Sequence, residues 1–262
     1  MTTPRIYLPQ KMEEGKTVEL GGENLHYIKT VLRLKRGNSL ILFGGTGFEY
    51  EAVIRDITTG SATIEITKKK EVQVDGSIKI TLAQALPKGS KMDFIIQKAT
   101  ELGVDRVIPF NSSRSIPKLT GSKIPLKISR WQKIAIEASR KCGREDIPEI
   151  TDIATFDEIL QHPKEDTLKI IFWEEESGTG IKEILRDKKY KEMTDFFVVV
   201  GPEGGFSREE IETASRAGFL PASLGRLVLK VETAALAILS ILQYERGALG
   251  NENIKIENLK IK

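Results

Sequence analysis

Three glycines within five residues, Gly201, Gly204 and Gly205, form the most informative chemical feature of this sequence. They follow residues 196–200, a continuous apolar run typical of a strand buried on both faces of a parallel sheet. Because glycine has no side chain, such a loop leaves backbone N–H and C=O groups open to close approach by a ligand. The pattern predicts a small-molecule site at the carboxyl edge of a sheet, although an ordinary structural turn fits the spacing equally well.

The residues after this loop continue the same pattern. Ser207 and Glu210 have the spacing of a capping box and predict that a helix begins there. A second glycine turn follows at Gly225, ahead of an apolar run over residues 231–242. The loop matches neither the P-loop pattern nor the dinucleotide fingerprint, and the acidic Glu203 argues against a polyphosphate ligand.

Histidine and cysteine contribute little to the predicted chemistry. The chain has two histidines, His26 and His162, and neither belongs to a recognisable motif. The single cysteine, Cys142, excludes an internal disulfide and a cysteine-based metal cluster, and we expect it to pack in the core. A histidine triad and a metal site are therefore not expected.

Basic residues gather in two stretches although the net charge is only +3. Residues 106–136 contain no acidic side chain, and their middle part is expected to be a long loop. Such clusters predict contacts with RNA phosphates, and a solvated surface is the alternative interpretation. The proposed RNA-binding residues are Arg33 and Lys35 near the end of the first helix, and Arg114, Lys118, Lys123 and Arg130 in the second stretch.

The order of the expected strands and helices indicates an α+β protein with two domains. Residues 1–72 read as a small β-rich domain, a compact barrel with strands expected at 5–8, 17–20, 39–43, 48–57 and 61–67 and one helix at 24–34. The charged residues 68–76 read as a linker, and residues 251–262 as a polar tail. Residues 73–250 alternate strands with helices, which predicts a parallel sheet. Strands are expected at 78–85, 104–110, 168–173 and 196–200, with helices at 90–102, 130–142, 181–186 and 234–243.

Two stretches are specific enough to indicate a family. They read V-V-V-G-P-E-G-G-F-S-R-E-E-I and L-G-R-L-V-L-K-V-E-T-A-A-L, and together they resemble the bacterial 16S ribosomal RNA uridine-N3 methyltransferases, the RsmE family of the SPOUT class. The opening P-R-I-Y, the run K-G-S-K-M-D-F-I-I-Q-K-A-T-E-L-G-V and the stretch C-G-R-E-D-I-P-E-I are similar to the same family. The resemblance covers nearly the whole chain, to about residue 250.

This resemblance carries several expectations. It implies an N-terminal PUA-like barrel, a C-terminal SPOUT domain with a trefoil knot, a homodimer, and S-adenosylmethionine (SAM) as cofactor. The RNA partner would be ribosomal RNA, within the small ribosomal subunit. Carried onto this sequence, the cofactor-binding residues are Trp173, Glu174, Gly201, Pro202, Glu203, Gly204, Gly205, Leu224, Gly225 and Leu229.

The chemistry of uracil narrows the catalytic candidates. N3 carries a proton at neutral pH, so its methylation needs a base or a cation that stabilises the imide anion. The candidates are Arg5, Arg144, Lys230 and Glu232. The family pattern commonly has arginines at the positions of Leu227 and Lys230, and lysine lacks the bidentate guanidinium fork. This departure puts a catalytic role at those positions in doubt.

Two alternatives remain open from the sequence. One is a SPOUT ribose 2′-O-methyltransferase, and the other is an RNA-binding homologue that has lost catalysis. The start of the chain has no basic region followed by an apolar core, and the longest apolar run is too short to span a bilayer. We therefore expect a cytoplasmic protein without a membrane partner.

Overall fold

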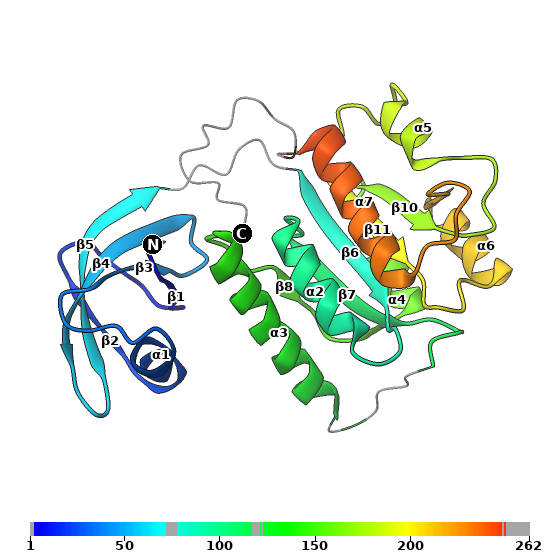
Figure 1. The fold of residues 1–262 in the computed structure, drawn as a ribbon. Helices are drawn as coiled ribbons and strands as arrows, with labels where there is room; N and C mark the ends of the chain where they lie inside the picture. Colours follow the sequence, from blue (N-terminus) through cyan, green and yellow to red (C-terminus); the bar gives the residue numbers. More distant parts are fainter. Residues whose placement is uncertain (1–2, 72–77, 117–120, 122, 248, 250–262) are drawn as a thin grey trace. The chain divides into compact units, whose positions relative to one another are not determined.

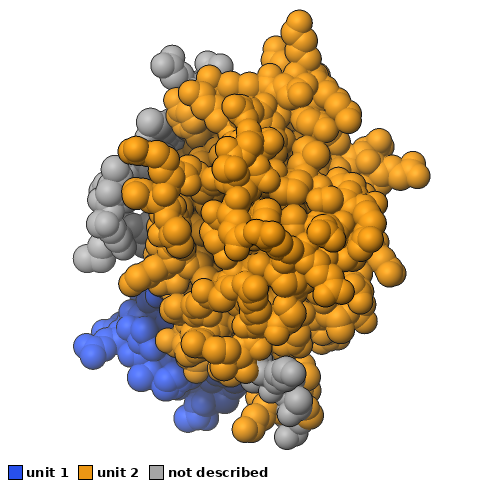
Figure 2. All heavy atoms as spheres, turned by 90° about the vertical axis from the view of Figure 1, so that its right-hand side faces the viewer, with its two compact units in different colours: residues 1–74, 135–147 blue, residues 75–134, 148–262 orange. Residues whose placement is uncertain are grey.

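The computed structural model describes residues 3–71, 78–116, 121, 123–247 and 249, which form two compact units. The first unit comprises Met1–Val74 with Ala135–Ile147, and the second comprises Asp75–Ile134 with Pro148–Lys262 (Figure 2). The domain boundary expected after residue 72 falls among residues 72–77, which lie outside the described part of the chain. The expected polar tail at 251–262 lies outside the described residues.

The first unit is built on a five-stranded sheet in the order β1-β3-β4-β5-β2. Strands β1 and β3 pair in parallel and the other neighbours are antiparallel. The expected helix at 24–34 is a short α-helix continued by one π-helical segment. The elements are β1 (Arg5–Tyr7), β2 (Thr17–Leu20), α1 (Gly22–His26), η1 (Tyr27–Val31), β3 (Ser39–Phe43), β4 (Phe48–Ile57) and β5 (Ala62–Glu71).

Alternation along β4 explains the core of this unit. Tyr50, Ala52 and Ile54 are buried, and the residues between them are more exposed. The linker expected to begin at residue 68 is wrong for residues 68–71, because these residues extend β5 and pair with β4. There the Lys69 ammonium lies 3.6 Å from the centre of the Phe48 ring. This cation–π contact stabilises the lysine within the strand. The rest of the expected linker, residues 72–76, lies outside the described part of the chain.

The return of Ala135–Ile147 to the first unit was not expected from the sequence. Arg5 Nη2 donates a hydrogen bond of 2.7 Å to the carbonyl oxygen of Arg144, and Gly45 N donates one of 3.1 Å to the carbonyl of Glu145. The Arg140 guanidinium also lies over the ring of Tyr27, 3.7 Å from its centre. These contacts join residues far apart in sequence, so local patterns do not reveal them.

The second unit contains a parallel sheet in the order β12-β10-β11-β6-β7-β8, with β9 paired to β7. β11 lies between β10 and β6, which is why its run Phe196–Val200 is buried throughout. The strands are β6 (Lys79–Ala85), β7 (Arg106–Asn111), β8 (Glu149–Ile150), β9 (Ala154–Thr155), β10 (Leu168–Phe172), β11 (Asp195–Val200) and β12 (Leu220–Ala222).

Helices cover both faces of this sheet (Figure 1). α2 and α7 pack together on one face, where α7 contacts β6 and β11. The opposite core includes Phe156 and Ile159 of α4, and Ile211 and Ala214 of α6. The helices are α2 (Lys91–Glu101), α3 (Lys123–Cys142), α4 (Phe156–Gln161), α5 (Ile181–Arg186), α6 (Arg208–Arg216) and α7 (Val231–Arg246).

Two local expectations need correction. α3 begins at Lys123 rather than near residue 130, because Pro125 falls in the first helical turn, where its missing N–H costs nothing. The loop before α3 is correspondingly shorter. Cys142 is exposed at the end of that helix rather than buried.

Candidate cofactor site

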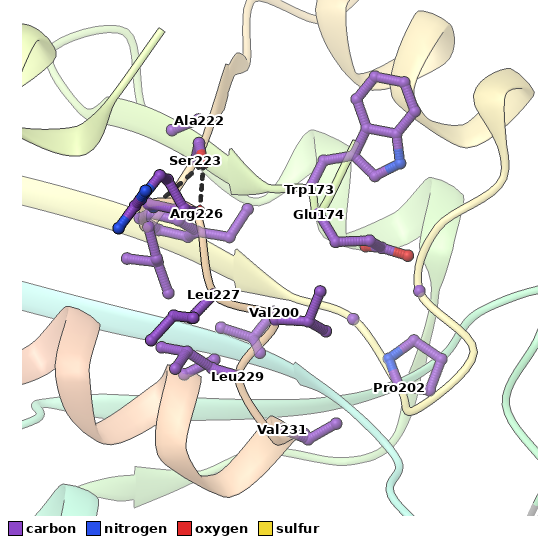
Figure 3. A pocket seen from close by; sticks show the side chains of 17 residues that line it. Trp173, Glu174, Val200, Pro202, Ala222, Ser223, Arg226, Leu227, Leu229 and Val231 are labelled. Carbon is purple, nitrogen blue, oxygen red and sulfur yellow. Dashed lines mark hydrogen bonds between the residues drawn. The ribbon is translucent and has the colours of Figure 1, made fainter. Parts of the chain in front are cut away.

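A cavity of about 650 Å³, including the space at its open mouth, lies where three parallel strands end. Phe172, Val200 and Ala222, at the carboxyl ends of β10, β11 and β12, stand in register across the sheet and line it (Figure 3). Its size and its position at the carboxyl edge of a parallel sheet are typical of small-molecule sites. Seventeen residues line it: Phe172, Trp173, Glu174, Val200, Gly201, Pro202, Gly205, Ala222, Ser223, Leu224, Gly225, Arg226, Leu227, Val228, Leu229, Val231 and Ala234.

The glycine loop forms one wall of this cavity, and two of its glycines leave little room for a side chain. A Cβ on Gly201 would lie 3.1 Å from the buried ring of Phe206. Gly205 has a left-handed φ of +64°, and a Cβ there would lie 2.5 Å from the carboxyl carbon of Glu174. The loop therefore brings its backbone to the cavity, as the sequence predicts, and seats the Glu174 side chain against Gly205.

Residues 222–231 form a second wall. Ser223 Oγ accepts a hydrogen bond of 3.1 Å from Gly225 N, which closes a tight turn (Figure 3). Beyond it, the side chains of Leu227 and Val228 are 77% and 84% exposed. The cavity is thus mainly apolar, and within its lining the charged side chains are Glu174 and Arg226.

The indole of Trp173 adds an unused donor at this edge of the sheet. Its Nε1 is buried and has no hydrogen-bond partner within the described part of the chain. A buried N–H without an acceptor is unfavourable.

Two predicted cofactor residues, Glu203 and Gly204, do not line the cavity. Glu203 Oε1 accepts hydrogen bonds of 2.7 Å from Lys91 Nζ and 3.1 Å from Lys88 N. Partial burial favours a higher pKa for Glu203, but the hydrogen bonds from Lys91 and from the backbone outweigh it and lower the pKa. The same hydrogen bond raises the pKa of Lys91, so the pair is ionised at neutral pH.

Comparisons with known proteins agree with this architecture. An RNA methyltransferase domain family matches residues 75–243, and an RNA methyltransferase PUA domain family matches residues 20–67. Ribosomal RNA small subunit methyltransferase E of Bacillus subtilis is 32% identical over 92% of this chain and 94% of its own length. This chain belongs to the ribosomal RNA small subunit methyltransferase E family.

Two solved structures of similar proteins contain bound SAM. The family member from Neisseria gonorrhoeae was solved bound to SAM; it is 31% identical, with a TM-score of 0.82, over 92% of this chain and 97% of that one. A Legionella pneumophila structure with bound SAM is 37% identical, with a TM-score of 0.84, over 93% of this chain and 98% of that one. The PUA domain and the parallel-sheet methyltransferase domain expected from the sequence are thereby confirmed.

The four predicted catalytic residues are divided between the two units. Lys230 and Glu232 lie in the second unit, at the N-cap and in the first turn of α7, next to cavity residues Leu229 and Val231. Arg5 and Arg144 lie together in the first unit. Arg5 pairs with Glu49 and stacks on Phe43, and Arg144 Nε donates a hydrogen bond of 3.0 Å to Asp146 Oδ1.

The predicted RNA-binding residues are spread over several elements. Arg33 has an unusual left-handed φ of +54° and, like Lys35, follows the end of η1. Arg114 Nη1 donates a hydrogen bond of 2.9 Å to the carbonyl of Gly204, so this residue also supports the glycine loop. Lys123 begins α3, and Arg130 on the same helix pairs with Asp93. Lys118 lies outside the described residues.

Sequence reasoning missed several residues of the site. Arg226, the basic side chain of the lining, was not among the predicted site residues. Lys91 was passed over as part of an amphipathic helix, since nothing near it in sequence indicates its partner Glu203. Val200 and Ala222 could have been found, because each is the last residue of a strand that ends at the site.

Among the described residues, no group of three or more histidine, cysteine, aspartate or glutamate side chains is arranged to hold a metal ion. None of the helices within the described ranges is long and apolar enough to cross a bilayer.

Proposed function

We propose that this chain transfers a methyl group from SAM to N3 of a uridine in 16S ribosomal RNA, with the small ribosomal subunit as substrate. The observation that carries the proposal is the cavity at the ends of β10, β11 and β12, with its glycine loop and its paucity of charge. It occurs in a chain that belongs to the methyltransferase E family and resembles a member solved with SAM.

The residues of the cavity fit the chemical groups of SAM. Apolar side chains such as Leu224 and Leu229 suit a purine ring, and exposed backbone groups of the glycine loop suit polar atoms of adenosine. The Glu174 carboxylate and the Arg226 guanidinium complement the amino and carboxylate groups of the methionine part. When bound, SAM supplies an electrophilic methyl group.

The protein must then accept the proton from N3 and stabilise the negative charge that remains on the uracil ring. We assign Glu232 as the acceptor of this proton, because it sits in the first turn of α7 beside the cavity residue Val231. The neighbouring Lys230 is assigned to stabilise negative charge that develops on the uracil carbonyls. Arg5 and Arg144 are also proposed to take part in catalysis, and Arg5 Nη2 donates a hydrogen bond to the carbonyl oxygen of Arg144. N3 lies on the Watson–Crick edge, so the base must be unpaired or flipped.

RNA binding is proposed for residues 1–72 as a PUA-like domain and for basic residues of 73–250, the SPOUT methyltransferase domain. The PUA family match over residues 20–67 supports the first part. Arg33, Lys35, Arg114, Lys118, Lys123 and Arg130 are the proposed phosphate contacts.

A homodimer is also proposed, on the basis of helix α7. One side of this helix is buried in the second unit, yet Leu236, Ala237 and Ile241 are only partly covered, and Tyr244 is 70% exposed. An incompletely buried apolar helix is typical of a subunit interface. A trefoil knot around this helix, and a cytoplasmic location, are proposed by resemblance to the SPOUT class.

Nucleoside analysis after methyl transfer tests the proposal. Small subunits from a strain lacking the endogenous enzyme would be incubated with methyl-labelled SAM, and the RNA digested to nucleosides. Label in 3-methyluridine is expected. Label in a ribose-methylated nucleoside would contradict base methylation, and SAM binding without transfer to either subunits or naked RNA would favour a non-catalytic homologue.

A further inference from the structure

Lys91 joins two carboxylates that belong to different segments of the second unit. Its ammonium is 2.7 Å from Glu203 Oε1 and 3.8 Å from Glu232 Oε2. Lys91 is the first residue of α2, Glu203 lies in the glycine loop, and Glu232 lies in the first turn of α7. The three side chains are 22% to 36% exposed, so water screens their attraction only in part.

The positions of the two carboxylates relate this cluster to the cavity. Glu203 directly follows Pro202, and Glu232 directly follows Val231, and both of these neighbours line the cavity. The cluster therefore connects the loop that forms one wall with the helix that forms another, without itself entering the lining. A change in its geometry would move both walls.

Glu232 depends on the Lys91 ammonium more than Glu203 does. Its Oε2 is buried and has no hydrogen-bond partner among the residues that the structure describes. The nearby Lys91 ammonium then supplies the compensating charge for this carboxylate, because a buried oxygen without a donor is otherwise costly. Glu203, in contrast, also receives the backbone N–H of Lys88.

We propose that Lys91 is a positioning residue of the cofactor pocket, which holds the glycine loop and the start of α7 at the spacing that SAM requires. This inference rests on the proposed function of the cavity. Lys91 does not touch the cofactor in this account; it acts through Glu203 and Glu232. The pocket is thus preformed, which reduces the ordering cost of binding.

Another ion pair on the same helix provides a matched control. Lys98 pairs with Glu101 at 2.8 Å, and these side chains are 34% and 32% exposed. The two pairs are similar in length and exposure, but the partner of Lys98 is three residues away on the same helix. Neither Lys98 nor Glu101 lines the cavity or directly adjoins a residue that does.

The experiment compares Lys91→Met with Lys98→Met by SAM titration calorimetry and by thermal unfolding. For Lys91→Met we expect roughly tenfold weaker SAM binding, about 1.4 kcal/mol, whereas Lys98→Met should bind SAM within about twofold of wild type. Lys91→Arg keeps the charge and should restore most of the affinity. Equal affinities for Lys91→Met and Lys98→Met would overturn the proposal.

A double-mutant cycle provides a second measurement if Lys91→Met folds poorly. Glu203→Gln removes one partner and Lys91→Gln removes the charge of the other, and combining them tests whether the two positions act together. We expect each single variant to weaken SAM binding and the double variant to bind about as weakly as Lys91→Gln alone. Independent, additive effects would contradict the inference. Wild-type protein that binds no SAM would refute the proposed function itself, whereas wild-type binding with unchanged variants refutes only the role of Lys91.

Discussion

Substitution of Gly205 by alanine tests the cavity at its most constrained point. Gly205 has a φ of +64°, and a side chain in this left-handed region costs about 1–2 kcal/mol. In addition, the new Cβ would lie 2.5 Å from Glu174 Cδ and 2.7 Å from Glu174 Oε2, closer than non-bonded atoms allow. Because Glu174 is an exposed, flexible side chain, its carboxylate should move away rather than the loop unfold.

The expected consequences can be separated by two assays. The backbone cost predicts a melting temperature lower by roughly 2–8 °C for a domain of this size. Displacement of Glu174 removes one charge-assisted contact to SAM, worth about 1.5–3 kcal/mol, which predicts roughly 10- to 100-fold weaker binding. Thermal unfolding without ligand measures the first effect, and calorimetric titration with SAM measures the second.

Gly218→Ala is the matched control. Gly218 also has a left-handed φ, of +84°, but the nearest atom to its Cβ would be Lys169 Nζ at 4.0 Å, an ordinary contact. We expect a similar loss of stability with unchanged SAM affinity. Glu174→Ala should weaken SAM binding to the level of Gly205→Ala, and the double variant should be no weaker. Wild-type affinity in Gly205→Ala would refute the placement of Glu174 in the site.

Three further predictions concern the surroundings of the site. Ser207→Ala removes the cap that accepts from Glu210 N and should lower the free energy of unfolding by about 1 kcal/mol in urea titrations; no loss would contradict the capping box. Arg114→Ala should weaken binding of small-subunit RNA and reduce the slope of log K against log salt by about one, measured by filter binding; an unchanged slope would exclude a phosphate contact. Burial raises the pKa of Glu145, so the folded protein holds this proton more tightly than the unfolded chain. This stabilisation is present below the ordinary value near 4.5 and is lost as pH rises through the folded-state pKa. Glu145→Gln should therefore gain stability relative to wild type between pH 4 and pH 7, and a pH-independent difference would contradict the assignment.

Sequence patterns correctly predicted elements whose structure depends on a few consecutive residues. The buried strand at Asp195–Val200 and the capping box at Ser207 were confirmed because their signals lie within a few consecutive residues. The predicted start of α3 near residue 130 was wrong, because Gly121 and Pro125 are typical of loops. Proline is nevertheless tolerated in the first turn of a helix, and α3 begins at Lys123. Cys142 was placed in the core by helical spacing, but the helix ends at this residue and leaves it exposed.

Cavity residues that directly follow a strand could be predicted from the sequence. Contacts between segments far apart in the sequence could not. Eight of the ten predicted cofactor residues line the cavity, since the glycine loop and the Leu224–Gly225 turn each follow a strand that ends there. The bond between Lys91 and Glu203 joins residues 112 positions apart and has no local signature. The packing of Arg5 against the backbone of Arg144 is likewise a product of tertiary structure.

Difference electron density from crystals soaked with S-adenosylhomocysteine would show whether this cavity holds the cofactor. We expect density inside the cavity between the glycine loop and residues 222–231, in contact with Gly201 and Leu229 and within reach of Glu174 and Arg226. Density at another surface of the chain, in protein that transfers methyl groups, would contradict the assignment of this cavity as the cofactor site.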